Sequence, residues 1–177
     1  MIDKDKKRAK DFLNIGGNDE CYTPKSVVKI IQKYIPKDKI IWCPFDKVES
    51  EFVIELSKTN KVIYSHIDNG QDFYTYEPAE HWDYIISNPP FTKKKEIFKR
   101  ALSFNKPFGL IMTNTWLNDS APKQLFKDKN FQLLFLIDRI NFINSNGEDM
   151  GRPPFSSSFF CYDLLPKDII IEDHRIM

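Results

Sequence analysis

No apolar run in this chain is long enough to cross a membrane. A membrane-spanning helix needs roughly 18 or more consecutive apolar residues, and no run of that length occurs. The basic N-terminal segment is also not followed by the apolar core that marks a secretion signal. From these absences we expect a cytoplasmic protein without a membrane partner.

Cysteine is scarce and irregularly spaced. The three cysteines, Cys21, Cys43 and Cys161, are odd in number and show no paired spacing typical of metal ligands. A disulfide framework and a zinc site each require such pairing, so neither is indicated. We expect reduced, buried thiols and no bound metal.

The chain also lacks an overall excess of charge. Its net charge of +1 gives no general attraction to nucleic acid, which requires a local excess of positive charge. Two segments have such a local excess, "KDKKRAK" near the N-terminus and "TKKKEIFKR" from Thr92 to Arg100. These are the segments predicted to contact phosphate groups.

Size and composition indicate one globular domain. The chain has 177 residues, of which 41% are hydrophobic and 29% are charged, enough for one substantial core and too few for two ordinary domains. Residues 1–19 are polar and end in "NIGGND", which predicts a flexible basic lead-in. Residues 20–177 are predicted to form the domain.

Strand-like and helix-like segments alternate along the chain. Strands are predicted at 39–42, 61–67, 82–87, 108–114, 131–138 and 156–165, and helices at 23–35, 49–58, 93–104 and 122–128. The first helix has Thr23 as a candidate N-cap and Pro24 at its first position. This alternation favours an α/β fold with a mostly parallel sheet covered on both faces. The last two predicted strands have no helix between them, which predicts an antiparallel hairpin at the edge of the sheet.

Polar or rigid segments follow four of the predicted strands. They are "WCPFD", "SHIDNGQDF", "SNPPF" and "TNTW". In an open α/β sheet the carboxyl ends of the strands meet at one crevice, where ligands bind. We therefore expect residues from these segments to share a site.

The sequence Asn-Pro-Pro-Phe, from Asn88 to Phe91, ends the third predicted strand. Two consecutive prolines cannot continue a strand ladder or a helix, and Pro90 forces Pro89 into an extended conformation. The Asn88 side chain and the Pro89 carbonyl can then point the same way beside the Phe91 ring. Two such acceptors suit a planar amine, and their hydrogen bonds favour a tetrahedral nitrogen with an available lone pair. The alternative interpretation is an ordinary turn.

With "WDYII" before it, "SNPPF" resembles the catalytic motif of amino-methyltransferases that use S-adenosylmethionine, in particular the DNA adenine-N6 methyltransferases. The resemblance runs from about Asn18 to Leu165 and is greatest to the small enzymes of phages and prophages. It implies a Rossmann-like class I methyltransferase fold with a mixed, mostly parallel seven-stranded sheet. It also implies S-adenosylmethionine as cofactor, DNA as partner, and Asn88, Pro89, Pro90 and Phe91 as catalytic residues.

The resemblance assigns cofactor contacts to four segments: Tyr22, Thr23 and Pro24 ahead of the first strand, Pro44, Phe45 and Asp46 after it, Asp68 after the second strand, and Asp72 with Phe73 further along. It implies that Asp46 bonds the cofactor's ammonium group and that Asp68 bonds its ribose hydroxyls. Asp72 would bond the amino group of its adenine, on which Phe73 would stack. His66 lies nearer than Asp68 to the family's usual carboxylate position, but a structural role is the preferred interpretation of this histidine.

The loop "CPFDKVES", residues 43–50, departs from the family pattern because it contains no glycine. Glycines in this loop normally let the backbone approach the methionine part of the cofactor. The missing glycines leave open a domain that has lost its cofactor and binds nucleic acid or a partner. A second alternative is a methyltransferase for RNA adenine or protein glutamine, since the resemblance at the Asn-Pro-Pro-Phe corner extends to such enzymes.

Five further residues are candidates for substrate contact: Lys93, Lys94, Lys95, Trp116 and Arg152. The lysines follow the Asn-Pro-Pro-Phe corner and either contact phosphate or form a solvated helix face. Trp116 either lines the target pocket or packs in the core. The few residues after Leu165 leave no room for a target-recognition domain, so a partner chain or a second copy is expected to supply recognition.

Overall fold

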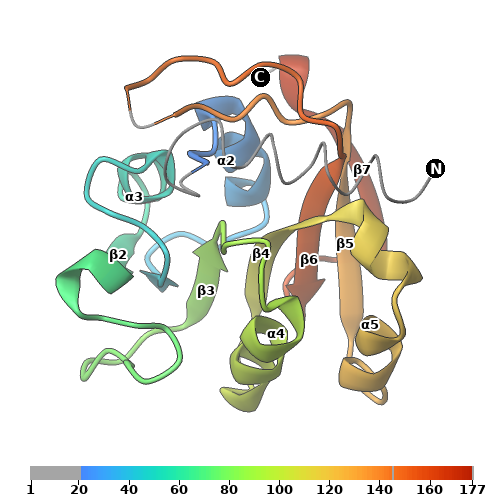
Figure 1. Cartoon of the computed structure of the whole chain (residues 1–177). Coiled ribbons are helices and arrows are strands. Elements are labelled where there is room, and N and C mark those ends of the chain that lie inside the picture. The colour runs from blue at the N-terminus through green and yellow to red at the C-terminus, as the bar shows by residue number, and fades with distance from the viewer. Residues whose placement is uncertain (1–20, 145, 177) are drawn as a thin grey trace.

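The computed structural model describes residues 21–144 and 146–176. Its strands form one seven-stranded sheet in the order β2-β1-β3-β4-β6-β5-β7 (Figure 1). Their bounds are β1 Ile40–Cys43, β2 Lys61–Tyr64, β3 Tyr84–Ser87, β4 Phe108–Thr113, β5 Phe131–Ile137, β6 Ser157–Tyr162 and β7 Ile169–Asp173. Each of the strands located from the sequence is present, and β7 is the one that the pattern did not locate.

The sheet is mostly parallel. Strands β2, β1, β3 and β4 run parallel to one another, β5 and β7 pair in parallel, and β6 is antiparallel to both β4 and β5. This confirms the predicted Rossmann-like α/β sheet with an antiparallel pair. The predicted edge position of that pair is wrong, because β6 lies between β4 and β5 while β7 forms the edge. All residues of β6 are buried, and a strand that is buried on both faces belongs in the interior of a sheet.

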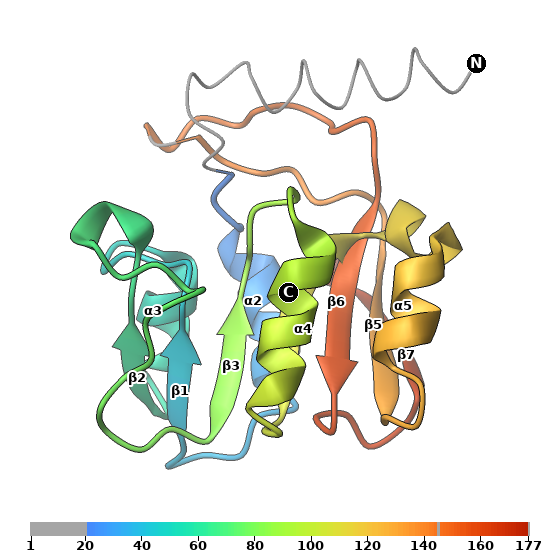
Figure 2. The same cartoon turned by 60° about the horizontal axis from the view of Figure 1, so that its bottom comes forward.

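Helices cover both faces of the sheet (Figure 2). The helices α2 (Lys25–Gln32) and α3 (Glu51–Leu56) pack on one face in a cluster that includes Ile86, while α4 (Lys94–Ser103) packs on the other face with Ile85. Neighbouring strand residues join opposite clusters because successive side chains point to opposite faces. Helix α5 is Ser120–Leu125, and three short 3-10 turns are η1 (Ile67–Asn69), η2 (Asn114–Asn118) and η3 (His174–Ile176).

The start of α2 differs from the prediction. Pro24, rather than Thr23, is the N-cap residue, with an extended backbone, and the helix begins at Lys25. Thr23 is buried, and its hydroxyl oxygen has no hydrogen-bond partner within the described part of the chain. Its side chain therefore does not cap the helix as expected.

The predicted lead-in, residues 1–19, lies outside the described residues. Within the described ranges, no helix is long and apolar enough to span a membrane, and no group of three histidine, cysteine or acidic side chains is placed to hold a metal ion. Cys43 and Cys161 are buried thiols, as predicted, while Cys21 is partly exposed.

Candidate functional site

A pocket of about 380 Å³ lies at the carboxyl ends of β1, β2 and β3. Segments far apart in the sequence line it: residues 21–23, residues 44–47 with Ser50, residues 66–68 and 72–74, and residues 88–92. Three of the four segments that were predicted to share a site, "WCPFD", "SHIDNGQDF" and "SNPPF", therefore line one pocket. The fourth, "TNTW" after β4, does not line this pocket.

Asn88 lines this pocket and has an unsatisfied side-chain acceptor. Its Nδ2 donates to the carbonyl oxygen of Cys21 at 2.9 Å, which fixes the orientation of the side-chain amide. Its Oδ1 is buried and has no hydrogen-bond partner among the residues described. Leaving a buried acceptor unsatisfied costs about 1–3 kcal/mol. A ligand that donates an N–H group to Oδ1 would remove this penalty.

The ring of Phe91 is held by residues distant in sequence. It is half-buried and makes edge-on contacts with Phe142 and Phe155, with ring centroids 6.1 Å and 5.4 Å away. Both phenylalanines belong to the connection between β5 and β6. Pro89 is buried and Pro90 is exposed, and both line the pocket. The corner is thus rigid, and part of its aromatic ring stays accessible.

Asp46 connects the loop after β1 to the Asn-Pro-Pro-Phe corner. Its buried carboxylate accepts hydrogen bonds from the hydroxyls of Ser50, at the start of α3, and Ser87, directly before Asn88. Burial raises the pKa of Asp46 to about 6, although both hydroxyl bonds act in the opposite direction. Burial and then the nearby Asp46 charge hold the pKa of the Cys43 thiol well above its usual range. The Asp46 carboxylate therefore supports the corner, and its contact with an ammonium group stays a prediction.

Asp68 lies at the mouth of the pocket in an ion pair. Its Oδ2 is 2.8 Å from Nζ of Lys47 and 3.4 Å from Nδ1 of His66. The hydrogen bond from Lys47 lowers the pKa of Asp68, which keeps this carboxyl ionised. Nδ1 of His66 also accepts a hydrogen bond from the Asp68 backbone at 3.2 Å, which agrees with the expected structural role of this histidine.

Asp72 and Phe73 line the pocket, but their side chains are less available to a ligand than the predicted contacts require. Asp72 Oδ1 accepts a hydrogen bond from the Tyr74 backbone at 3.0 Å and so stabilises its own turn. Phe73 is only 2% exposed and packs 4.8 Å from Phe45 and 5.6 Å from Trp42. Phe45 and Tyr74 also line the pocket and are partly exposed, so they offer more ring surface to a ligand than Phe73 does.

The other residues assigned to the cofactor are near the same place. Tyr22 lines the pocket and is paired by backbone hydrogen bonds of 2.8 Å and 3.0 Å with Ile143. Thr23 and Pro44 also line it. Like Asn88 Oδ1, the buried Thr23 hydroxyl has no hydrogen-bond partner among the described residues. Pro24 is not part of the lining, since it caps α2.

The lysines after the corner differ in their surroundings. Lys93 is the N-cap of α4, with a left-handed backbone, and its Nζ lies 5.8 Å above the ring of Tyr74 at the pocket. Lys94 donates to the Thr113 hydroxyl at 3.2 Å, and burial lowers the pKa of its ammonium group. Lys95 is exposed. The run therefore combines a residue at the pocket rim, a partly buried residue and a solvated one.

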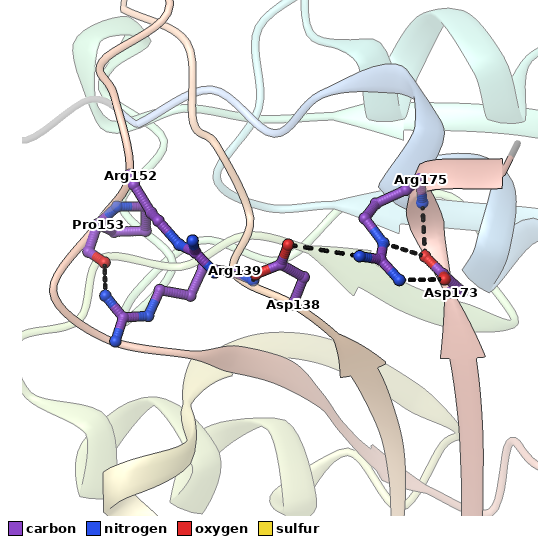
Figure 3. Close-up of polar contacts among 6 residues, drawn as sticks. All are labelled: Asp138, Arg139, Arg152, Pro153, Asp173 and Arg175. Atoms are coloured by element: carbon purple, nitrogen blue, oxygen red, sulfur yellow. Dashed lines mark hydrogen bonds and ion pairs between the residues drawn. The ribbon is translucent and has the colours of Figure 1, made fainter.

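Trp116 and Arg152 do not lie at the pocket. Trp116 is 2% exposed and packs against Phe98 and Phe160 at centroid distances of 4.5 Å and 5.4 Å. Of its two predicted roles, packing is the one that the structure supports. Arg152 is exposed and pairs with Asp138 at 2.5 Å, beside the ion pairs of Arg175 (Figure 3).

The sequence pattern missed several contributors to the site. Ser87 and Thr92 begin quoted segments and Tyr74 directly follows one, but none of the three was assigned a role. The backbone carbonyl of Cys21, which anchors Asn88, carries no sequence signal at all. These contacts depend on how distant segments pack.

No protein-family model and no curated protein matches the sequence. Several solved structures resemble the fold at low identity. A protein assigned as a class I S-adenosylmethionine-dependent methyltransferase from Listeria monocytogenes is 11% identical, with 96% of this chain and 73% of that chain covered and a TM-score of 0.47. A predicted O-methyltransferase from Agrobacterium tumefaciens is 10% identical, with 82% and 84% covered and a TM-score of 0.45. A TehB-like SAM-dependent methyltransferase from Corynebacterium glutamicum is 10% identical, with 93% and 100% covered and a TM-score of 0.40. The fold assignment of this chain rests on its own strand order and strand directions.

Proposed function

We propose that this protein transfers a methyl group from S-adenosylmethionine to the exocyclic N6 of adenine in DNA. The observation that carries the proposal is the buried Oδ1 of Asn88, an acceptor without a partner among the described residues, on the wall of the pocket. The Phe91 ring lies in the same wall, and Pro89 holds its carbonyl on a rigid corner. This arrangement suits a flat amine attached to a ring.

The pocket also suits the proposed cofactor. Its volume of about 380 Å³ lies within the range of small-molecule sites. Phe45 and Tyr74 provide ring surface for an adenine, Asp68 provides an acceptor for hydroxyl groups, and the buried Thr23 hydroxyl needs a partner. When bound, S-adenosylmethionine would supply an electrophilic methyl group on a sulfonium.

The chemistry assigned to this chain is activation of the amine. Asn88 Oδ1 and the Pro89 carbonyl accept the two N–H groups, which favours a tetrahedral nitrogen whose lone pair is available for attack. The bond from Asn88 Nδ2 to the Cys21 carbonyl keeps Oδ1, rather than Nδ2, directed at the substrate. Positive charge that develops on the nitrogen is stabilised by the same two oxygens until its extra proton leaves.

The proposed DNA partner requires the target adenine to leave the duplex. Unstacking costs a few kcal/mol, and stacking on an aromatic ring such as Phe91 returns about 1–3 kcal/mol. Lys93 and Lys95 lie on the segment that follows the corner and supply positive charge for phosphate contacts. Recognition of the target sequence is assigned to a partner chain or a second copy of this chain.

The test is transfer of labelled methyl groups to DNA, RNA and protein in parallel. We expect label in DNA with the unchanged protein and none with Asn88→Ala. Asn118→Ala, which removes an exposed asparagine of η2, is the matched control and should stay active. Full activity of Asn88→Ala would refute the role of the corner, while label in RNA or protein alone would favour the alternative methyltransferase.

A second candidate function is a cofactor-free binding domain. Two observations favour it, the glycine-free loop 43–50 and the ion pair of Lys47 with Asp68 at the pocket mouth. Such a domain would bind nucleic acid or a partner without methyl transfer. Direct titration with the cofactor separates it from the enzyme.

A further inference from the structure

We propose that Lys47 binds the carboxylate of the amino-acid end of S-adenosylmethionine, in place of the backbone contacts that a glycine-rich loop would make. The inference rests on the proposed function and names a specific ligand contact within the same pocket. Lys47 lines the pocket, with its side chain 24% exposed.

The balance of charge in the pocket supports this assignment. Among the described residues that line it, Lys47 is the only lysine or arginine, against the three acidic residues Asp46, Asp68 and Asp72. The amino-acid end of the ligand carries a carboxylate as well as an ammonium group. A carboxylate placed among three acidic side chains requires a cation, because like charges repel at short range. Lys47 is the basic side chain of the lining that can pair with it.

Part of the backbone of the same loop is not available to donate to a ligand. Pro44 has no N–H group, the Asp46 N–H donates to the Ser65 carbonyl at 3.2 Å, and the Ser50 N–H donates to the Lys47 carbonyl at 3.0 Å. Without a glycine, side chains also keep a ligand from approaching this backbone closely. We therefore assign the carboxylate contact to a side chain of the loop rather than to its backbone alone.

The ion pair between Lys47 and Asp68 can open when a ligand binds, so that Lys47 pairs with the ligand instead. The Asp68 side chain is 56% exposed, so water can solvate its carboxylate after the pair opens. Transfer of Lys47 from Asp68 to the ligand carboxylate keeps the ammonium group paired. It also releases the Asp68 oxygens for the ribose hydroxyl groups of the ligand. Binding of the two ends of the ligand is thereby coupled.

The experiment compares two ligands that differ in the amino-acid end. S-adenosylhomocysteine contains that end and 5′-methylthioadenosine does not, and each is titrated calorimetrically at pH 7.5. The proteins are the unchanged chain, Lys47→Met, Lys47→Arg and the control Lys58→Met, which removes an exposed, ion-paired lysine of the neighbouring helix end. Circular dichroism melting checks that each variant is folded.

We expect Lys47→Met to weaken S-adenosylhomocysteine binding about 10- to 100-fold, because one charge-assisted hydrogen bond is removed, and not to weaken 5′-methylthioadenosine binding. Lys47→Arg should restore most of the affinity, and Lys58→Met should bind as the unchanged chain does. If Lys47→Met weakens both ligands equally or neither, the inference is overturned while the proposed function stands. If the unchanged chain binds neither ligand, the proposed function fails and the inference fails with it.

Discussion

Replacing Asp46 by asparagine should remove a pH-dependent loss of stability. The pKa of this carboxyl is 3.8 in its ordinary state and about 6 in the folded protein, because burial disfavours the charged form. At about 1.4 kcal/mol per pKa unit, the ionised carboxylate lowers the free energy of unfolding by about 3 kcal/mol. The Asp46 carboxyl holds its proton more tightly in the folded chain than in the unfolded chain. The free energy of unfolding therefore falls as the pH rises from about 4 to about 6, and it stays lowered by the full amount above pH 6.

The assay is urea unfolding at several pH values between 4 and 7, followed by the fluorescence of the buried tryptophans. Because asparagine does not ionise, the stability of Asp46→Asn relative to the unchanged protein should rise by about 2–3 kcal/mol across this range. Asp128→Asn, at an exposed position, is the matched control. A stability difference that does not change with pH would show that Asp46 is not a buried carboxylate supporting Ser50 and Ser87.

Two further predictions concern residues first assigned to substrate. Trp116→Ala should lower the free energy of unfolding in urea by about 3–5 kcal/mol, since the ring is buried against Phe98 and Phe160; near-normal stability with abolished DNA affinity would restore its predicted role in the target pocket. Replacing Lys93 and Lys95 by glutamine should weaken DNA binding, measured by fluorescence anisotropy at several salt concentrations. The slope of log affinity against log salt should fall by about one for each phosphate that the lysines no longer neutralise, and an unchanged slope would assign these lysines to a solvated face.

Local patterns predicted most of the fold. Alternating apolar strands and amphipathic helices are properties of short segments, so the sequence contained enough to locate all strands but β7. β7 was not located because its residues 169–173, Ile-Ile-Ile-Glu-Asp, do not alternate between apolar and polar types, although exposed and partly buried positions alternate along it in the structure. The interior position of β6 depends on its pairing with both β4 and β5. These pairings join segments that are distant in the sequence, so a local pattern does not predict them.

For the candidate site, the sequence predicted which residues lie together but not which contacts they make. Residues at strand ends could be placed together because parallel strands end at one edge, and Asn88 and Asp46 do lie at one pocket. Which partner each side chain takes could not be predicted, as the bonds of Asp46 to Ser50 and Ser87 show. Trp116 illustrates the same limit, since an aromatic residue after a strand is compatible with either a pocket wall or the core.

The measurement that tests the central claim most directly is calorimetric titration of the unchanged protein with S-adenosylmethionine. The pocket beside Asn88 is proposed to hold this cofactor despite the glycine-free loop, so saturable binding with one site per chain and a dissociation constant in the micromolar range is predicted. Asn88→Ala should bind the cofactor equally well, since Asn88 is assigned to the substrate amine. Absence of binding at millimolar cofactor would contradict the methyltransferase and leave the binding domain as the function of this fold.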